Sequence, residues 1–240
     1  MAVGALRDDV EMGALVRRGL DVGFVTVRPA LEAVWLAAGQ RPMRRGHLLR
    51  SGLHAGMGLM VIGLVHALPS VEAMRLVATV ATLLAWAVEG ARSVLPGVNG
   101  LMMRVFGRTA HAHEVAEVNS ATWYTTAMCV LSWTVSPQAA TVGIAVLAFG
   151  DPAAALVGRR FGRIRLVGRR TLEGALTMTT VGTAFAALTL LTWGIPMGAA
   201  VGLGAVAGTA GAAAEVGSLR VDDNLAIPVV AAFATAWLGL

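Results

Sequence analysis

The sequence predicts an all-α integral membrane protein, a polytopic bundle of about seven transmembrane helices preceded by an interfacial N-terminal helix. The 240-residue chain is 56% hydrophobic and 14% charged, with a mean hydropathy of +0.70, which is too apolar for a soluble domain. Apolar stretches near the twenty or so residues that a bilayer requires recur along it. The arginines concentrate in a few polar linkers between these stretches, which is typical of cytoplasmic loops.

The apolar stretches define the predicted spans. Seven are clear, at about 48–68, 71–89, 119–136, 138–157, 171–193, 197–216 and 225–240. An earlier apolar segment, residues 22–39, carries Arg28 and Glu32 and either spans with a buried pair or lies at the interface. It follows a charged lead-in, residues 1–20, that lacks the uninterrupted apolar core of a signal peptide. We prefer seven spans plus an interfacial helix, with eight spans as the alternative.

The linkers predict the orientation of the bundle. Those without charge are tight, at 69–70, 137 and 194–196, whereas the others are polar and rich in arginine, at 40–50, 90–118, 158–170 and 217–224. Because positive loops stay on the cytoplasmic side, we expect all candidate chemistry to face the cytoplasm, in the cytoplasmic membrane. We expect two parts, an N-terminal lead-in with the interfacial or first helix over 1–40 and one integral-membrane domain over 41–240.

The charge balance is basic, with a formal net charge of +5 and a sequence pI near 11.1. Because the arginines lie between hydrophobic segments, we expect them to face anionic lipid and nucleotide phosphate, and we expect no nucleic-acid partner. The single cysteine, Cys129, lies in an apolar segment and is interpreted as a small core residue. The oligomeric state is left open.

Small residues recur at close spacing in the predicted span 197–216. They include Gly198, Gly202, Gly204, Gly208 and Ala212. Such spacing lets helix backbones approach each other in lipid, so we expect this segment to serve packing.

The stretch from Gly150 to Gly174 contains the clearest chemistry. Asp151 follows the almost wholly apolar segment 138–149, and a carboxylate at the edge of a membrane helix marks a functional site by default. An alternative is that Asp151 and Pro152 only start a helix. Beyond Asp151, glycines alternate with Arg159, Arg160, Arg163, Arg165, Arg169 and Arg170. Arginine guanidinium groups and the backbone N–H groups of glycines can bind phosphate oxygens, which indicates a site for a polyphosphate or an anionic lipid headgroup. The alternative is that the arginines serve only to orient the protein in the membrane.

This stretch resembles the nucleotide-binding signature of the CTP-dependent lipid-alcohol kinases: dolichol kinase, phytol kinase and CTP-dependent diacylglycerol kinase, within a wider group that includes phosphatidate cytidylyltransferase. Arginine stands where lysine is common, and Thr171 stands where serine is common. The family pattern is met by Gly150, Asp151, Ala153, Ala154, Gly158, Arg159, Gly162, Gly168, Arg169, Arg170, Thr171, Leu172, Glu173 and Gly174. The resemblance implies that this stretch binds CTP, although Glu173 is also accounted for as an acid at a helix start.

Three further groups resemble the family over roughly 50–228; the third is the ending with Glu215, Asp222, Asp223 and Asn224, where Ala226 stands at a position that is commonly threonine. Arg50 and His54 share a helix face, and His54 is either a catalytic base or a polar anchor. The resemblance also implies a nucleotide-binding role for Glu89, Arg92, Asn99, His113, Glu114 and Asn119. Ordinary helix structure would equally account for three of these residues, with Glu89 and Arg92 as an i,i+3 ion pair and Asn119 as a helix N-cap. A transition-metal site around His113 lacks a third strong ligand.

Asp222 and Asp223 precede the last predicted span, and Glu215 lies one or two helical turns before them. One of the paired acids is expected to cap the helix. Two adjacent carboxylates are more than a cap needs, and together with Asp151 they are the predicted Mg²⁺ ligands, since hard cations prefer oxygen.

The resemblance implies transfer of the γ-phosphate of CTP to the hydroxyl of a membrane lipid alcohol, either diacylglycerol or an isoprenoid alcohol such as polyprenol or phytol. Asp151, Asp223 and His54 are the candidates for the base. Mg²⁺ would bridge phosphate oxygens, and a clamp on the triphosphate would be formed by Arg159, Arg160, Arg163, Arg169 and Arg170. The alternatives are a cytidylyltransferase that makes a CDP-lipid and a non-enzymatic anion or lipid transporter.

Overall fold

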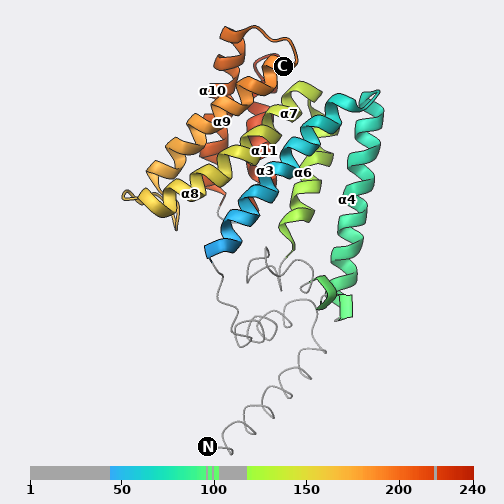
Figure 1. Cartoon of the computed structure of the whole chain (residues 1–240). Helices are drawn as coiled ribbons and strands as arrows, with labels where there is room; N and C mark the ends of the chain where they lie inside the picture. The colour runs from blue at the N-terminus through green and yellow to red at the C-terminus, as the bar shows by residue number, and fades with distance from the viewer. Residues whose placement is uncertain (1–43, 96, 99, 103–117, 219–220) are drawn as a thin grey trace, which may run out of the picture. The chain divides into compact units, whose positions relative to one another are not determined.

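All regular elements of the computed structural model are helices, over the residues it describes: 44–95, 97–98, 100–102, 118–218 and 221–240 (Figure 1). The elements are α3 (Arg44–Ala67), α4 (Val71–Val94), α6 (Ser120–Thr134), α7 (Pro137–Ala145), the π-helical turn η2 (Val146–Gly150), α8 (Asp151–Phe161), α9 (Leu172–Thr192), α10 (Met197–Gly217) and α11 (Asp223–Ala236). The predicted lead-in, the 22–39 segment and the predicted boundary at residue 40 lie outside these ranges.

Among the described residues, four helices are long and apolar enough to cross a membrane: Val71–Val94, Pro137–Phe161, Leu172–Thr192 and Met197–Gly217. Two shorter apolar helices lie at Ser51–Ala67 and Asp223–Ala236. The all-α membrane fold is therefore confirmed, and each of the seven predicted segments coincides with helix, but the count of seven spans stays a prediction. Large apolar side chains on α4 are exposed, including Leu76, Leu83 and Leu84, as expected of a helix that faces lipid.

The tight, uncharged linkers of the sequence are turns between antiparallel helices. Ser136 caps α7 by accepting a hydrogen bond from the Ala139 N–H at 3.1 Å, and Pro137 occupies the first turn, where no N–H is needed. Between α9 and α10, Gly194 has a φ of +76°, in the left-handed region that favours glycine. These turns explain why so few residues connect the helices.

Close packing of α9 against α10 depends on glycines of α10. A Cβ at Gly208 would lie 2.5 Å from the Thr179 carbonyl oxygen and 2.7 Å from the Thr183 nitrogen. Gly204 is similarly close to α9, whereas a Cβ at Gly202 would meet nothing within 4 Å. The predicted packing role is therefore confirmed for Gly204 and Gly208, because these glycines face α9.

No helix break separates Asp151 from the preceding apolar segment. α7, η2 and α8 form one continuous run, and both Gly150 and Asp151 have right-handed helical backbone angles. The interpretation of Asp151 as an N-cap is thus wrong. Pro152 lacks an N–H and its ring crowds the preceding turn, and widening that turn into η2 accommodates it. Such π turns are frequent at functional sites.

The chain divides into two compact units. The larger comprises Leu48–Val88 and Ser120–Leu240, and residues Glu89–Asn119 belong to the other. Within the larger unit, contacts show which helix ends lie together. Thr171, just before α9, lies beside Gly158 near the end of α8, at what we call the arginine end. At the opposite end, the far end, His66 of α3 stacks on Trp193 after α9, with ring centroids 4.3 Å apart. Hence α3 runs parallel to α9 and antiparallel to α8.

Candidate functional site

The arginine loop, residues 159–170, comprises the last turn of α8 and a short hairpin that leads to α9. The Leu172 N–H donates to the Ile164 carbonyl at 2.9 Å, and the Leu166 N–H donates to the Arg170 carbonyl at 3.0 Å. Gly168 lies in the turn with a φ of +59°, which explains the glycine at this position of the motif. The hairpin presents its arginines to solvent at the end of an apolar helix pair.

Thr171 holds the base of this loop. It is 7% exposed, and its hydroxyl caps α9 by accepting a hydrogen bond from the Gly174 N–H at 3.2 Å. A Cβ at Gly162 would lie 2.6 Å from Thr171 Cγ2, and one at Gly158 would lie 3.0 Å from Thr171 Oγ1. Gly158 and Gly162 therefore serve packing, since they let the end of α8 close onto Thr171. Their predicted phosphate role stays a prediction.

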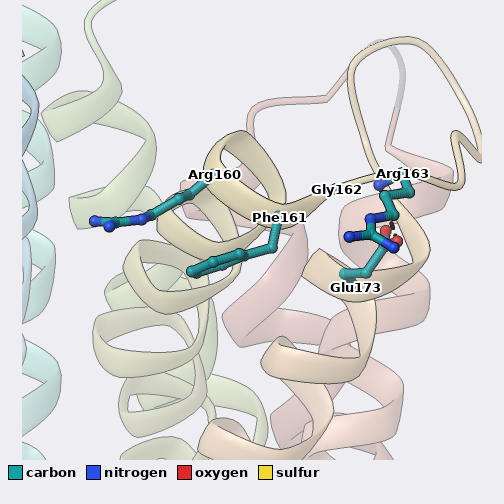
Figure 2. A pocket seen from close by; sticks show the side chains of 5 residues that line it. All are labelled: Arg160, Phe161, Gly162, Arg163 and Glu173. Atoms are coloured by element: carbon teal, nitrogen blue, oxygen red, sulfur yellow. Dashed lines mark hydrogen bonds between the residues drawn. The ribbon is translucent and has the colours of Figure 1, made fainter.

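Glu173 fastens the loop from the other side. Its carboxylate accepts hydrogen bonds from the backbone N–H groups of Arg163, at 2.9 Å, and Ile164, at 3.3 Å. A pocket of about 440 Å³ is lined here by Arg160, Phe161, Gly162, Arg163 and Glu173 (Figure 2). In Figure 2, Arg160 extends beside the Phe161 ring, with its guanidinium carbon 5.5 Å from the ring centroid. Glu173 thus holds the loop backbone, which is a structural role beside the predicted nucleotide role.

Arg170 joins the loop to the turn between α10 and α11. Its Nη2 donates to both carboxylate oxygens of Asp223, at 2.7 and 2.9 Å, and its Nη1 donates to the Ser218 carbonyl at 3.3 Å. The Ser218 hydroxyl donates to the same carboxylate at 2.7 Å. Asp222 beside it caps α11 by accepting from the Asn224 N–H at 2.9 Å. The expected cap is therefore Asp222, and Asp223 does not take part in capping.

Glu215 is a site residue to which sequence reasoning assigned no role. It lies on α10 one turn before the α10–α11 turn, within electrostatic reach of Asp151, Asp223 and Arg170. Its Oε2 is buried without a hydrogen-bond partner among the residues that the structure describes. Glu215 thus lies near both Asp151 and Asp223. An acid in an apolar helix was a signal that could have identified it.

The described residues contain no group of three His, Cys, Asp or Glu side chains arranged to hold a metal ion. Mg²⁺ would not require such a group, because that ion usually binds one or two carboxylates and completes its coordination with substrate phosphates and water. Asp151 is a suitable ligand of that kind. Asp223 already accepts hydrogen bonds from Arg170 and Ser218 and would bind the ion only by exchanging those contacts, and Asp222 caps α11.

His54 lies on α3 against Tyr124 of α6, with ring centroids 6.2 Å apart in an edge-on arrangement. Sequence reasoning selected His54 but not Tyr124, because no motif contains the tyrosine. Of the residues predicted around Arg50, only the backbone of that part of α3 is described.

The other unit contains the pair Glu89 and Arg92. Both are buried, and Arg92 Nε donates to Glu89 Oε1 at 2.9 Å, which confirms the predicted i,i+3 pair. The Asn119 N–H donates to Glu89 Oε2 at 3.3 Å. The remaining predicted residues of this group, Asn99, His113 and Glu114, lie outside the described residues.

Comparison with known proteins finds similarity to a lipid-alcohol kinase. The chain is similar to the phytol kinase of Synechocystis sp., with 40% identity over 107 residues. The match covers 43% of this chain and 45% of that protein, so the chain spans less than half the length of the relative. No protein-family model matches the chain, and no solved structure does.

This similarity and the resemblance in the sequence motifs both point to the lipid-alcohol kinases. The similarity is also compatible with a lipid substrate and with the four apolar helices of the fold.

Proposed function

We propose that the protein is an integral-membrane lipid-alcohol kinase that transfers the γ-phosphate of CTP to the hydroxyl of a membrane lipid alcohol. The observation that carries the proposal is the arginine loop. Within the described part of the chain, only Arg170 of its six arginines is ion-paired. The other five are exposed and form no ion pair there, although Arg163 lies within electrostatic reach of Glu173. They are Arg159, Arg160, Arg163, Arg165 and Arg169. A rigidly mounted loop with several unpaired guanidinium groups suits a polyphosphate.

The acids next to the loop support group transfer over simple binding. Asp151, Glu215 and Asp223 lie at the arginine end, where the terminal phosphate of a bound nucleotide would be found. Acidic side chains repel an anionic ligand. Their presence beside the loop is explained if they bind a cation or accept a proton during the reaction. Mg²⁺ on Asp151 and Asp223 would supply charge neutralisation of the phosphate oxygens.

The reaction proceeds by attack of the alcohol oxygen on the γ-phosphorus. The new O–P bond forms as the bond to the departing CDP oxygen breaks, and the alcohol proton passes to a base, for which Asp151 and His54 remain the candidates. Such transfers depend mainly on positioning and on neutralisation of spread negative charge, which the arginines supply. Similarity to a phytol kinase favours an isoprenoid alcohol as the acceptor, with diacylglycerol as the alternative.

We also propose that the arginine end faces the cytoplasm in the cytoplasmic membrane. Among the described residues, the far end carries only Arg75 and His66 as basic residues. Arginines are therefore more numerous at the arginine end than at the far end, and membrane proteins orient with their more positively charged end in the cytoplasm.

Product analysis tests the proposal. The detergent-purified protein is incubated with CTP, Mg²⁺ and phytol, a polyprenol or diacylglycerol, with ATP and phosphatidate as controls. CDP together with a lipid monophosphate is the expected result. Formation of pyrophosphate and a CDP-lipid from phosphatidate would contradict the kinase and show that the protein is a cytidylyltransferase. No turnover with any pair would contradict both enzymes and favour an anion or lipid transporter.

A further inference from the structure

Tyr124 is a buried polar residue that neither the motifs nor the arginine loop explain. It is 7% exposed, on the second turn of α6, and packs within the hydrophobic core of the larger unit. Its hydroxyl oxygen is buried and has no hydrogen-bond partner among the residues that the structure describes. Burying a phenol group in this way is unfavourable, so a polar ligand atom at the hydroxyl would account for it.

Two contacts, that of Tyr124 with His54 of α3 and that of Gly58 of α3 with Ala148, show the depth of this hydroxyl in the bundle. A Cβ at Gly58 of α3 would clash with the Ala148 side chain of η2, so the helices cross closely there. Since α3 and the α7–α8 run are antiparallel, one turn from Gly58 towards the arginine end leads to His54 on one helix and to the region of Asp151 and Pro152 on the other. His54 and Tyr124 therefore lie at about the depth of Asp151.

That depth suits the hydroxyl of a lipid alcohol. Asp151 and Gly158, where the arginine loop begins, are separated by two turns of α8, or about 10 Å along the helix axis. A triphosphate that is bound by the loop and directed towards Asp151 can span the distance between the loop and that residue. The α3 residues Leu53 and Met57, on either side of His54 in sequence, are 54% and 46% exposed and provide an apolar surface for the tail.

We propose that Tyr124 and His54 form the binding site for the acceptor hydroxyl, with the tyrosine O–H donating a hydrogen bond to the alcohol oxygen. This inference rests on the proposed function, because it identifies how the same active site holds its lipid. The tyrosine leaves one lone pair of the alcohol oxygen directed at the nucleotide. It contacts the substrate without accepting the proton.

Replacing Tyr124 by phenylalanine removes the hydroxyl and keeps the ring. We expect Tyr124→Phe to raise the KM for the lipid alcohol about tenfold, leave the KM for CTP unchanged, and leave the melting temperature unchanged or higher, because the hydroxyl stabilises nothing in the fold. The matched control, Thr134→Val, deletes a hydroxyl at the far end of the same helix and should change neither KM. An unchanged KM for the alcohol, or a lower melting temperature with both KM values intact, overturns the inference.

A binding measurement separates this inference from the proposed function. Tyr124 is the only tyrosine of the chain, so protein labelled with ¹³C-tyrosine gives one tyrosine NMR signal in detergent micelles. Without nucleotide, we expect phytol, polyprenol or diacylglycerol to shift this signal and the hydrocarbon phytane to leave it in place. No shift with any alcohol, or an equal shift with phytane, overturns the inference even if the kinase is active. A shift of the signal without CDP formation in the activity assay would contradict the proposed kinase activity and still support the alcohol-binding site.

Discussion

Arg170 and Asp223, fifty-three positions apart in the chain, form an ion pair that fastens the arginine loop to the start of α11. Its nitrogen–oxygen distance is 2.7 Å, and the Ser218 hydroxyl shares the carboxylate. The pair removes one arginine and one acid from the set of free charges at the arginine end. It also makes the position of the loop depend on the α10–α11 turn.

A double-mutant cycle should detect this coupling. Because both side chains are partly exposed, at 20% and 35%, we expect Arg170→Ala and Asp223→Ala each to destabilise by only about 0.5–1.5 kcal/mol. The double variant should lose less than the sum of the two, by thermal unfolding in detergent. Arg165→Ala is the control from the same loop, with no expected change. Strict additivity of the two substitutions would show that the ion pair contributes no coupling energy.

The exposed arginines should bind nucleotide without stabilising the fold. We expect Arg159→Ala and Arg163→Ala each to raise the KM for CTP about tenfold, since a charge-assisted hydrogen bond contributes about 1.5–3 kcal/mol. The melting temperature and the KM for the alcohol should stay the same, and the KM for CTP should rise with ionic strength. Steady-state kinetics measures both constants.

The control for this prediction removes a positive charge elsewhere. Arg75→Gln does so at the far end, where Arg75 donates to the Ser132 carbonyl at 3.1 Å. It should leave the KM for CTP unchanged. An equal increase for Arg75→Gln would mean that net charge, and not the loop, determines nucleotide affinity.

Two glycines of α10 provide a matched test of the helix packing. Gly208→Ala directs a methyl group at the backbone of α9, and we expect a loss of about 1–3 kcal/mol. Gly202→Ala lies in open space on the same helix and should stabilise by about 0.5–1 kcal/mol, because alanine loses less conformational entropy. Thermal unfolding of both variants checks the pair. Equal effects would contradict the packing of α9 on α10.

The positions of the helices could be predicted from the sequence because each is a continuous apolar run bounded by charges or turn residues. The π turn before Asp151 could not, because a Pro at that position is equally compatible with a new helix, and only packing selects the continuous one. Pro152 and Asp151 therefore belong to the interior of a helix. The predicted span 138–157 already included both residues, with a helix start at Asp151 as the alternative.

The sequence also identified the arginine loop, since its glycines and arginines are adjacent in the chain. It placed Glu215 near the paired acids without assigning it a role, and it missed Tyr124, because their neighbours come from distant helices: Asp151 for the first and His54 for the second. Apolar helices carry no local signal of which face meets which partner. Side chains that act across such a bundle become visible only when the helices are in place.

The acids Asp151 and Glu215 give the last prediction, which separates chemistry from folding. Asp151→Asn keeps the size of the side chain and removes its charge, and we expect kcat to fall by at least about a hundredfold while the protein stays folded. Glu215→Gln should have a smaller effect on kcat, because Glu215 lies within electrostatic reach of Asp151 and Asp223 and would act through their charge. Measuring kcat and the melting temperature for both variants tests this order. Near-normal activity of Asp151→Asn would remove Asp151 from the reaction, and a greater loss in Glu215→Gln would make Glu215 the carboxylate that contacts the substrate.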